Sequence, residues 1–194
     1  MDRAQPPRQL TLGEGFDARP SRRLFFGLWP DESAACKLEQ LMRKLHQEGI
    51  MPGRPVDTDR LHLTLFHLGD FVDQIPSSLV PAAKLAAANL AWKPFDIVFD
   101  RIGGTRGQFL LRASHELAAL RHFRETLGAE LIAAGLRRYV DRAFTPHITL
   151  SYDLSDAPEM LVEPAGWSVR EFHLVESRLG KHQHIRLGSW GIKG

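Results

Sequence analysis

Hydrophobic and polar positions alternate over some stretches of the chain and recur at helical spacing over others. The apolar run at 24–29 predicts a buried strand. Alternation predicts further strands at 61–68, 95–101 and 146–152, a strand at 108–112 beyond a glycine turn at 103–107, and two closing strands at 171–179 and 184–190. Together with the helices these strands predict an α+β fold.

Three helices are predicted between these strands. The first begins at Pro30 and the acidic residues after it and stops at Gly49, with Leu38, Met42 and Leu45 on its apolar side. The second runs from a serine cap at 77–78 to about 89. The third begins at a cap at Ser114 and ends at Gly135.

One pattern occurs on two predicted strands. His62 begins the sequence H-L-T-L, and His147 begins H-I-T-L. Because side chains alternate along a strand, each histidine shares a face with the threonine two residues on, Thr64 or Thr149. About 0.3 H-x-T matches are expected by chance at this composition, so two copies in strand-like surroundings indicate a site.

Two histidines facing each other are suited to acid-base chemistry. One neutral imidazole can take a proton from water while a protonated one gives a proton to a leaving oxygen. Two hydroxyls can donate hydrogen bonds to phosphoryl oxygens that gain charge. The repeat predicts two antiparallel sheets facing a central cleft, with the helices outside.

Composition narrows the class of protein. The formal charge of +2 is too small for a nucleic-acid coat, although it allows a local basic patch. The chain has one cysteine, Cys36, which excludes a disulfide framework and a cysteine-based zinc site and suits a reducing cytoplasm. Residues 1–22 are expected to form a mobile extension, and 23–194 a single bilobal domain. No stretch has the length and apolarity of a membrane span.

With its repeated motif, the chain resembles the two-histidine (2H) phosphoesterases. The branch it resembles is the bacterial RNA 2′,3′-cyclic phosphodiesterases, also called 2′-5′ RNA ligases. The resemblance rests on L-F-F-G-L-W-P at 24–30, both H-x-T-L motifs, F-T-P before His147, and L-V-E-S-R-L at 174–179. It implies a bilobal pseudo-two-fold fold and a metal-independent opening of a ribose 2′,3′-cyclic phosphate that leaves a 2′-phosphate.

The resemblance also implies roles for residues. His62 would donate a proton to the leaving 3′ oxygen, His147 would activate water, and Thr64 and Thr149 would hold the phosphate. No cofactor is implied. The expected partners are RNA ends or nucleotides that carry a 2′,3′-cyclic phosphate, with no membrane and no obligate protein partner.

The chain departs from the family at two positions. Tyr152 stands where many relatives have a phosphate-contacting arginine, and a phenol lacks the charge and fork of a guanidinium. His67 replaces a usual phenylalanine, and its parity with Leu63 and Leu65 predicts a structural role. Phe66 shares parity with His62, so either base stacking or core packing would explain it.

Basic residues near predicted strand ends and turns are further candidates for RNA contacts, although most such side chains are simply solvated: Arg106, Arg112, Arg142, Arg178, Lys181 and Arg186. His182 and His184 have the spacing for a metal site, but a polar closing strand explains them better. The competing functions are a 2′-5′ ligase, a phosphodiesterase of small cyclic phosphates, and a non-catalytic nucleotide- or RNA-binding module.

Overall fold

The computed structural model describes residues 19–105, 107–153 and 157–191. The helices are α1 (Glu32–Gln47), α2 (Leu79–Asn89) and α3 (Ala118–Ala133), with short 3₁₀ turns η1 (Thr58–Arg60) and η2 (Arg137–Tyr139). The strands are β1 (Arg22–Leu28), β2 (Arg54–Pro55), β3 (Leu63–Phe71), β4 (Phe95–Thr105), β5 (Gln108–Arg112), β6 (His147–Tyr152), β7 (Met160–Val169), β8 (Glu171–Arg178) and β9 (Gln183–Gly191).

The strands form two antiparallel groups that meet at one point. Hydrogen bonds connect them in the order β7-β4-β5-β6-β3-β1-β8-β9, with β2 beside β6. The two groups are joined where β3 pairs with β6, and the register there has one residue pair, Leu63 with Ile148. The α+β class is confirmed. The two predicted sheets, however, are hydrogen-bonded into one continuous sheet, whose two halves are connected by a single residue pair.

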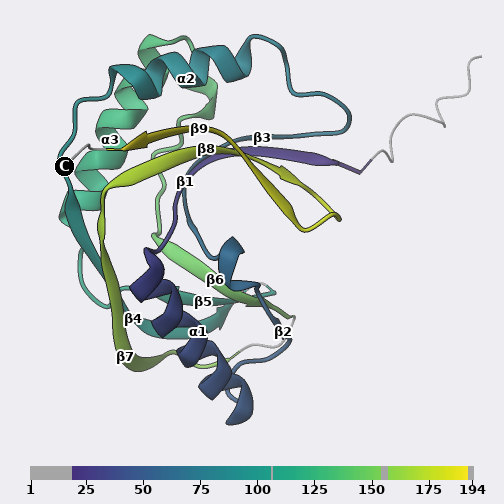
Figure 1. The fold of residues 1–194 in the computed structure, drawn as a ribbon, viewed down its shortest axis with the longest axis vertical. Coiled ribbons are helices and arrows are strands. Elements are labelled where there is room, and N and C mark those ends of the chain that lie inside the picture. The colour runs from purple at the N-terminus through teal and green to yellow at the C-terminus, as the bar shows by residue number, and fades with distance from the viewer. Residues whose placement is uncertain (1–18, 106, 154–156, 192–194) are drawn as a thin grey trace, which may run out of the picture.

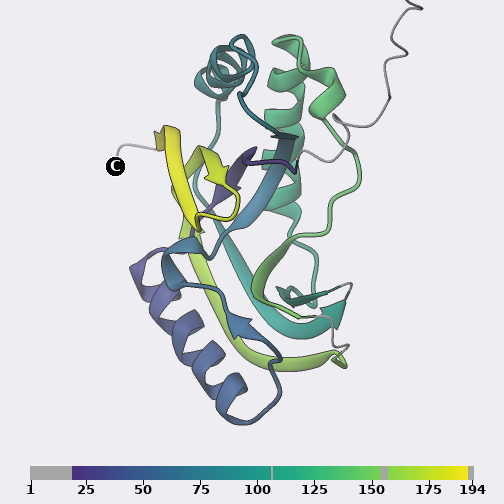
Figure 2. The same ribbon diagram turned by 90° about the vertical axis from the view of Figure 1, so that its right-hand side faces the viewer.

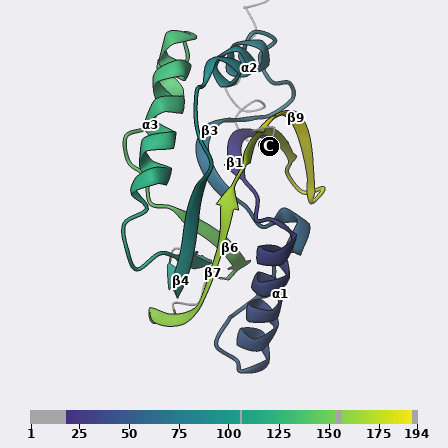
Figure 3. The same cartoon turned by 60° about the vertical axis from the view of Figure 1, so that its left-hand side comes forward.

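The helices lie outside the strands, at opposite ends of the molecule (Figure 1). α2 and α3 pack against each other at one end, beside the β1, β3, β8 and β9 group. α1 lies at the other end and packs against β7, as the turned views also show (Figures 2 and 3).

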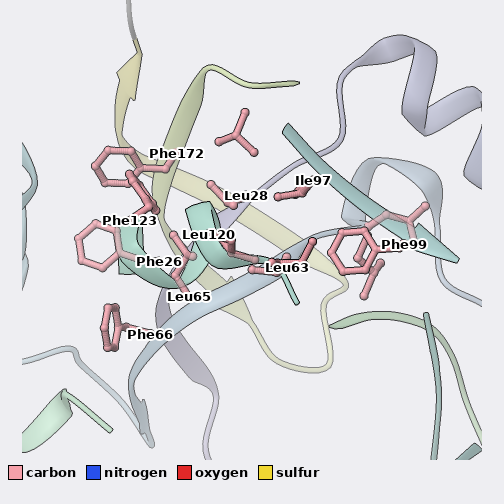
Figure 4. Packing of buried hydrophobic residues seen from close by; sticks show 14 of the residues in the cluster. Phe26, Leu28, Leu63, Leu65, Phe66, Ile97, Phe99, Leu120, Phe123 and Phe172 are labelled. Atoms are coloured by element: carbon pink, nitrogen blue, oxygen red, sulfur yellow. The ribbon is translucent and has the colours of Figure 1, made fainter. Parts of the chain in front are cut away.

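One hydrophobic core fills the space between the strands and the helices. It joins Phe26 and Leu63 from the motif side of the sheet to Leu120 and Phe123 of α3 and Phe172 of β8, and their side chains are nearly or fully buried (Figure 4). Leu63, Leu65, Ile148 and Leu150, the aliphatic residues of the two motifs, are at most 2% exposed. The predicted alternation within both motifs is confirmed.

Both motif strands bulge directly after the H-x-T-L sequence. β1 pairs Phe26 with Phe66 and Gly27 with Thr64, which leaves Leu65 as an extra residue in β3. β5 pairs Phe109 with Ser151 and Leu110 with Thr149, which leaves an extra residue in β6 in the same way. An extra residue shifts all later side chains to the other face of the sheet.

Several element boundaries differ from the prediction. The strand predicted at 61–68 begins at Leu63 and continues to Phe71, because a second register shift accommodates Gly69 at φ 126°. Gly103 and Gly104 lie within β4 rather than in a turn, and β7 is a strand that the pattern did not predict. Ser114 does not cap α3: it bonds Asp100, and Leu117 precedes the helix.

The predicted extension at 1–22 falls mostly on residues 1–18, which lie outside the described part of the chain. Its last residues belong to the fold. The amide of Ser21 donates to the Phe71 carbonyl at 2.9 Å, and Arg22 begins β1 opposite Phe71 and Arg178. The helices of the described part are too short or too polar to cross a membrane.

Candidate active site

The single β3–β6 pair brings the two motifs together on one face of the sheet. In an antiparallel register that pairs Leu63 with Ile148, His62 stands opposite Thr149, and Thr64 stands opposite His147. Directly opposite side chains in such a ladder have Cβ atoms about 5 Å apart. Each histidine therefore lies beside the threonine of the other motif, as a pseudo-two-fold axis through the pair requires.

The backbone orients both imidazoles in the same way. Nδ1 of His62 lies 2.6 Å from the carbonyl oxygen of Arg60, and Nδ1 of His147 lies 2.8 Å from that of Thr145. A carbonyl only accepts, so each Nδ1 carries the proton and donates it. The other ring nitrogen, Nε2, is then the atom of each histidine that these backbone bonds leave free for a ligand.

Aromatic rings enclose His62. The Trp29 ring stacks on it at 5.2 Å between centroids, the Phe25 ring lies at 4.8 Å, and the His184 ring meets it edge-on at 5.1 Å. Gly27, opposite Thr64 in β1, makes this possible, because a Cβ there would come within 3.0 Å of Trp29. The sequence analysis did not identify Trp29 and Gly27 as site residues, and it considered His184 only as a metal ligand.

This enclosure changes the acidity of two imidazoles. Burial, reinforced by nearby charges that include Arg60 and His147, lowers the pKa of His62 from 6.5 to about 4. Burial, followed by the neighbouring His62, lowers the pKa of His184 to about 4 as well. Nδ1 of His184 is buried with no hydrogen-bond partner among the described residues. The free protein therefore holds both rings neutral at pH 7.

Acid should destabilise the fold through these two rings. Unfolding returns each histidine to a pKa near 6.5, so the unfolded chain binds more protons below that pH and stability falls as pH drops toward 4. We expect the free energy of unfolding to fall by roughly 3 kcal/mol between pH 7 and pH 5 through the pair. Denaturant titration at both pH values measures this difference.

The matched variant for this prediction is His184→Phe. It removes one proton-binding group and the unpartnered Nδ1 while keeping a ring against His62. We expect it to match the parent or exceed it in stability at pH 7 and to lose about half of the acid sensitivity. If the stability of His184→Phe falls with pH as steeply as that of the parent, burial of these two rings is not the cause of the acid sensitivity.

A cavity of about 450 Å³ opens beside the motifs. Thr64 and His147 line it, and so do His67, Arg138 and Tyr139. The walls come from β3, from η2 and from the loop that precedes β6. A smaller cavity of about 180 Å³ is lined by Trp29, Arg60, His182, His184 and Arg186. Substrate-sized space therefore adjoins the catalytic candidates on the His147 side.

The remaining predicted site residues have different positions. The β6 bulge puts Tyr152 on the same face as Thr149, where its side chain is 58% exposed, so it can reach the cleft. Arg106 lies outside the described residues. The structure contradicts a contact of Phe66 with a base. The β3 bulge turns Phe66 to the core face beside Phe26, where its side chain is 2% exposed. The Arg124 guanidinium lies 4.2 Å over its ring. No face of Phe66 is free for a base.

The basic candidates separate into paired and cleft-facing side chains. Arg112 stands opposite His147 in the register, and its guanidinium donates to Glu159 at 2.5 Å. Arg186 lies over the Trp29 ring at 5.7 Å.

His182 is in the turn before β9 and contacts Arg60, so it does not share a strand face with His184 as an H-x-H metal site would require. Among the described residues, no three metal-ligating side chains of His, Cys, Asp or Glu gather.

Solved structures share this fold. Apo LigT of E. coli matches with a TM-score of 0.70 and 26% identity over 89% of this chain and 98% of that one. TT0787 of Thermus thermophilus matches with a TM-score of 0.69 and 26% identity over 89% and 98%. E. coli LigT in complex with ATP matches with a TM-score of 0.67 and 25% identity over 89% and 99%. No curated protein sequence matches the chain.

Fold and site together define a class of protein, the two-histidine phosphoesterases, in which paired H-x-T-L strands meet at the centre of an α+β domain. The model of one family, described as the 2′-5′ RNA ligase superfamily, matches residues 29–181. The chain belongs to that superfamily.

Proposed function

We propose that this protein hydrolyses the 2′,3′-cyclic phosphate of RNA ends or nucleotides to a 2′-phosphate without a metal. The observation that carries the proposal is the Leu63–Ile148 register, which sets His62 beside Thr149 and His147 beside Thr64 on one face. A phosphate between the motifs would meet two ring nitrogens and two hydroxyls at once. Non-catalytic binding would not require this matched pair of proton-transfer groups.

The proposed reaction is an in-line displacement at phosphorus. Nε2 of His147 takes a proton from water as the water oxygen bonds to phosphorus. The bond from phosphorus to the ribose 3′ oxygen breaks, and Nε2 of His62 gives that oxygen a proton. Thr64 and Thr149 donate hydrogen bonds to the remaining phosphoryl oxygens, which gain charge in the transition state. The product carries a free 3′ hydroxyl and a 2′-phosphate.

The donor role of His62 depends on the substrate. In the free protein its pKa is about 4, so it holds a proton on Nε2 only when something favours the charged ring. The negative charge of a bound phosphate does so, because an opposite charge at close range raises the pKa of a histidine. His62 then takes up a proton as the phosphate binds, and it holds that proton until the 3′ oxygen leaves.

The same residues also support ligation. If the 5′ hydroxyl of a second RNA replaces water, His147 takes the proton of that hydroxyl as its oxygen bonds to phosphorus, the bond to the 3′ oxygen breaks, and His62 protonates the 3′ oxygen, so that a 2′-5′ linkage results. The superfamily description favours this second candidate. Structures of E. coli LigT with 3′-AMP and with ATP indicate that a relative's fold accepts nucleotides, which supports a nucleotide or RNA end as the substrate class here.

Metal independence separates this proposal from metal-assisted hydrolysis. We expect 2′,3′-cyclic AMP to be turned over at the same rate before and after exhaustive treatment with EDTA, because the histidines transfer the protons and the hydroxyls stabilise the charge. The measurement is product formation by chromatography. A rate that falls in EDTA and returns with a divalent ion would contradict the mechanism, and binding of the nucleotide without turnover would identify a binding module.

A further inference from the structure

His67 occupies a place in the first motif strand that corresponds to that of Tyr152 in the second. Each stands two residues after the motif leucine. The bulge at Leu65 brings His67 opposite Phe25, whose ring contacts His62, so His67 points to the catalytic face. The bulge in β6 brings Tyr152 to that face in the same way. The face predicted for His67, which followed from unbroken alternation, is therefore wrong.

A polar cluster on the same face holds His67 in place. Its Nε2 lies 2.9 Å from a carboxylate oxygen of Asp70. The guanidinium of Arg23 clamps the same carboxylate through two hydrogen bonds of 2.7 and 2.9 Å. These bonds lower the pKa of Asp70 to about 2, the Arg23 bonds contributing most. The carboxylate is thus neutralised by Arg23, and it fixes one ring nitrogen of an exposed histidine.

The opposite wall of the cavity carries a stacked cation and aromatic ring. The Arg138 guanidinium lies 4.5 Å over the Tyr139 ring and donates to the Tyr139 hydroxyl. Both side chains line the 450 Å³ cavity that Thr64, His147 and His67 also line. Guanidinium planes and aromatic rings are the surfaces on which single-stranded RNA bases stack. Such a stack within the catalytic cavity has no part in the chemistry at phosphorus.

We propose that His67, Arg138 and Tyr139 form a strand subsite, which binds the RNA nucleotide preceding the cyclic end. The proposal rests on the proposed function and adds its substrate class: RNA strands in preference to single nucleotides. In the strand subsite the base stacks on the Arg138–Tyr139 pair and the phosphodiester that links it to the terminal ribose meets His67. Arg138 brings a positive charge toward the anionic chain, and His67 brings a ring nitrogen, Nδ1, that Asp70 does not use. The Asp70 carboxylate is also bonded by Arg23, and Asp141, which lines the same cavity, accepts from the Ala143 amide.

The size of the cavity agrees with this assignment. A volume of about 450 Å³ is in the range of pockets that take drug-sized ligands, and it exceeds what a cyclic phosphate ring alone would fill. The smaller cavity lined by Trp29, at about 180 Å³, is too small for a further nucleotide. The space that borders Thr64 and His147 is therefore the cavity that His67, Arg138 and Tyr139 also line.

The test compares two substrates, 2′,3′-cyclic AMP and a triribonucleotide that ends in a 2′,3′-cyclic phosphate. We expect kcat/KM to be higher for the triribonucleotide in the parent protein. In His67→Phe and in Arg138→Gln, the ratio of the two kcat/KM values should fall about tenfold, mostly through KM, since one phosphate or stacking contact is lost. The matched control is Arg137→Gln, which removes the same charge from η2 at a residue that does not line the cavity.

Unchanged ratios in both His67→Phe and Arg138→Gln, or an equal fall in Arg137→Gln, would overturn the strand subsite. A binding measurement keeps this result separate from the proposed function. Anisotropy of a labelled triribonucleotide that ends in a 2′-phosphate should show weaker binding in both variants and a shallower salt dependence, by roughly 0.7 in log–log slope for each lost phosphate contact. If the parent turns over neither substrate, the proposed function is wrong. The strand subsite is then tested by the anisotropy measurement alone, and equal binding of the labelled RNA by the parent and both variants would overturn it.

Discussion

Replacement of His147 by alanine is expected to reduce kcat for a 2′,3′-cyclic nucleotide by about 10² to 10⁴-fold while the protein stays folded. Water is a poor nucleophile without a base, and Nε2 of His147 is the atom that the Thr145 carbonyl leaves free for that task. His62→Ala should lose a similar factor, since no other group then protonates the leaving oxygen. Steady-state kinetics with circular dichroism on each variant measures rate and fold together.

The two losses should not add. Because acid and base act in one transition state, the double variant is expected to be little slower than either single variant. His122→Ala is the matched control: His122 is an exposed histidine of α3 that does not line the cavity, and its rate should stay within about twofold of the parent. Parent rates in a folded His147→Ala protein would show that the paired motifs are not the active site.

The second large effect is expected on stability, at Arg124. This arginine is 7% exposed and lies between the Phe66 and Phe144 rings at 4.2 and 4.4 Å. It donates to the carbonyl of Leu65 at 2.9 Å and to that of Asp141 at 2.7 Å. Leu65 is the extra residue of the bulge, so Arg124 bonds the backbone at the point where β3 changes face.

Arg124→Ala should lower the free energy of unfolding by roughly 3 kcal/mol, because two charge-assisted hydrogen bonds and two cation–π contacts are lost. Arg124→Lys should lose most of the same amount, since an ammonium lacks the planar fork that bonds both carbonyls between two rings. Arg43→Ala removes an exposed helical ion pair with Glu39 and should cost less than about 1 kcal/mol. Chemical denaturation compares the three, and a loss of stability in Arg124→Ala no larger than that in Arg43→Ala would contradict this role.

Alternation along the chain was enough to predict the faces of both motifs. Leu63, Leu65, Ile148 and Leu150 are buried as the pattern requires. The prediction failed after the first motif, because unbroken alternation does not allow for a bulge. It put His67 on the core face and Phe66 on the face of His62, although core packing of Phe66 was left open. The available signal was the adjacent apolar pair Leu65 and Phe66, which interrupts the alternation.

Side chains brought to the site from other strands could not be predicted in this way. His184 reaches His62 through β8 and β1, and no local spacing relates residue 184 to residue 62. Trp29 follows a strand that the apolar run at 24–29 placed correctly, yet that run gives no sign of the face on which Trp29 lies. Gly27 was the one hint, because a glycine inside a strand often marks a close approach of another group.

The most direct test of the central claim is the identity of the product formed from 2′,3′-cyclic AMP by the EDTA-treated protein. Phosphorus NMR distinguishes 2′-AMP from 3′-AMP in the reaction mixture. Proton donation from His62 to the 3′ oxygen, with water activated at His147, predicts 2′-AMP as the product in the parent and its loss in His147→Ala. Formation of 3′-AMP, or no hydrolysis by the folded parent protein, would contradict it.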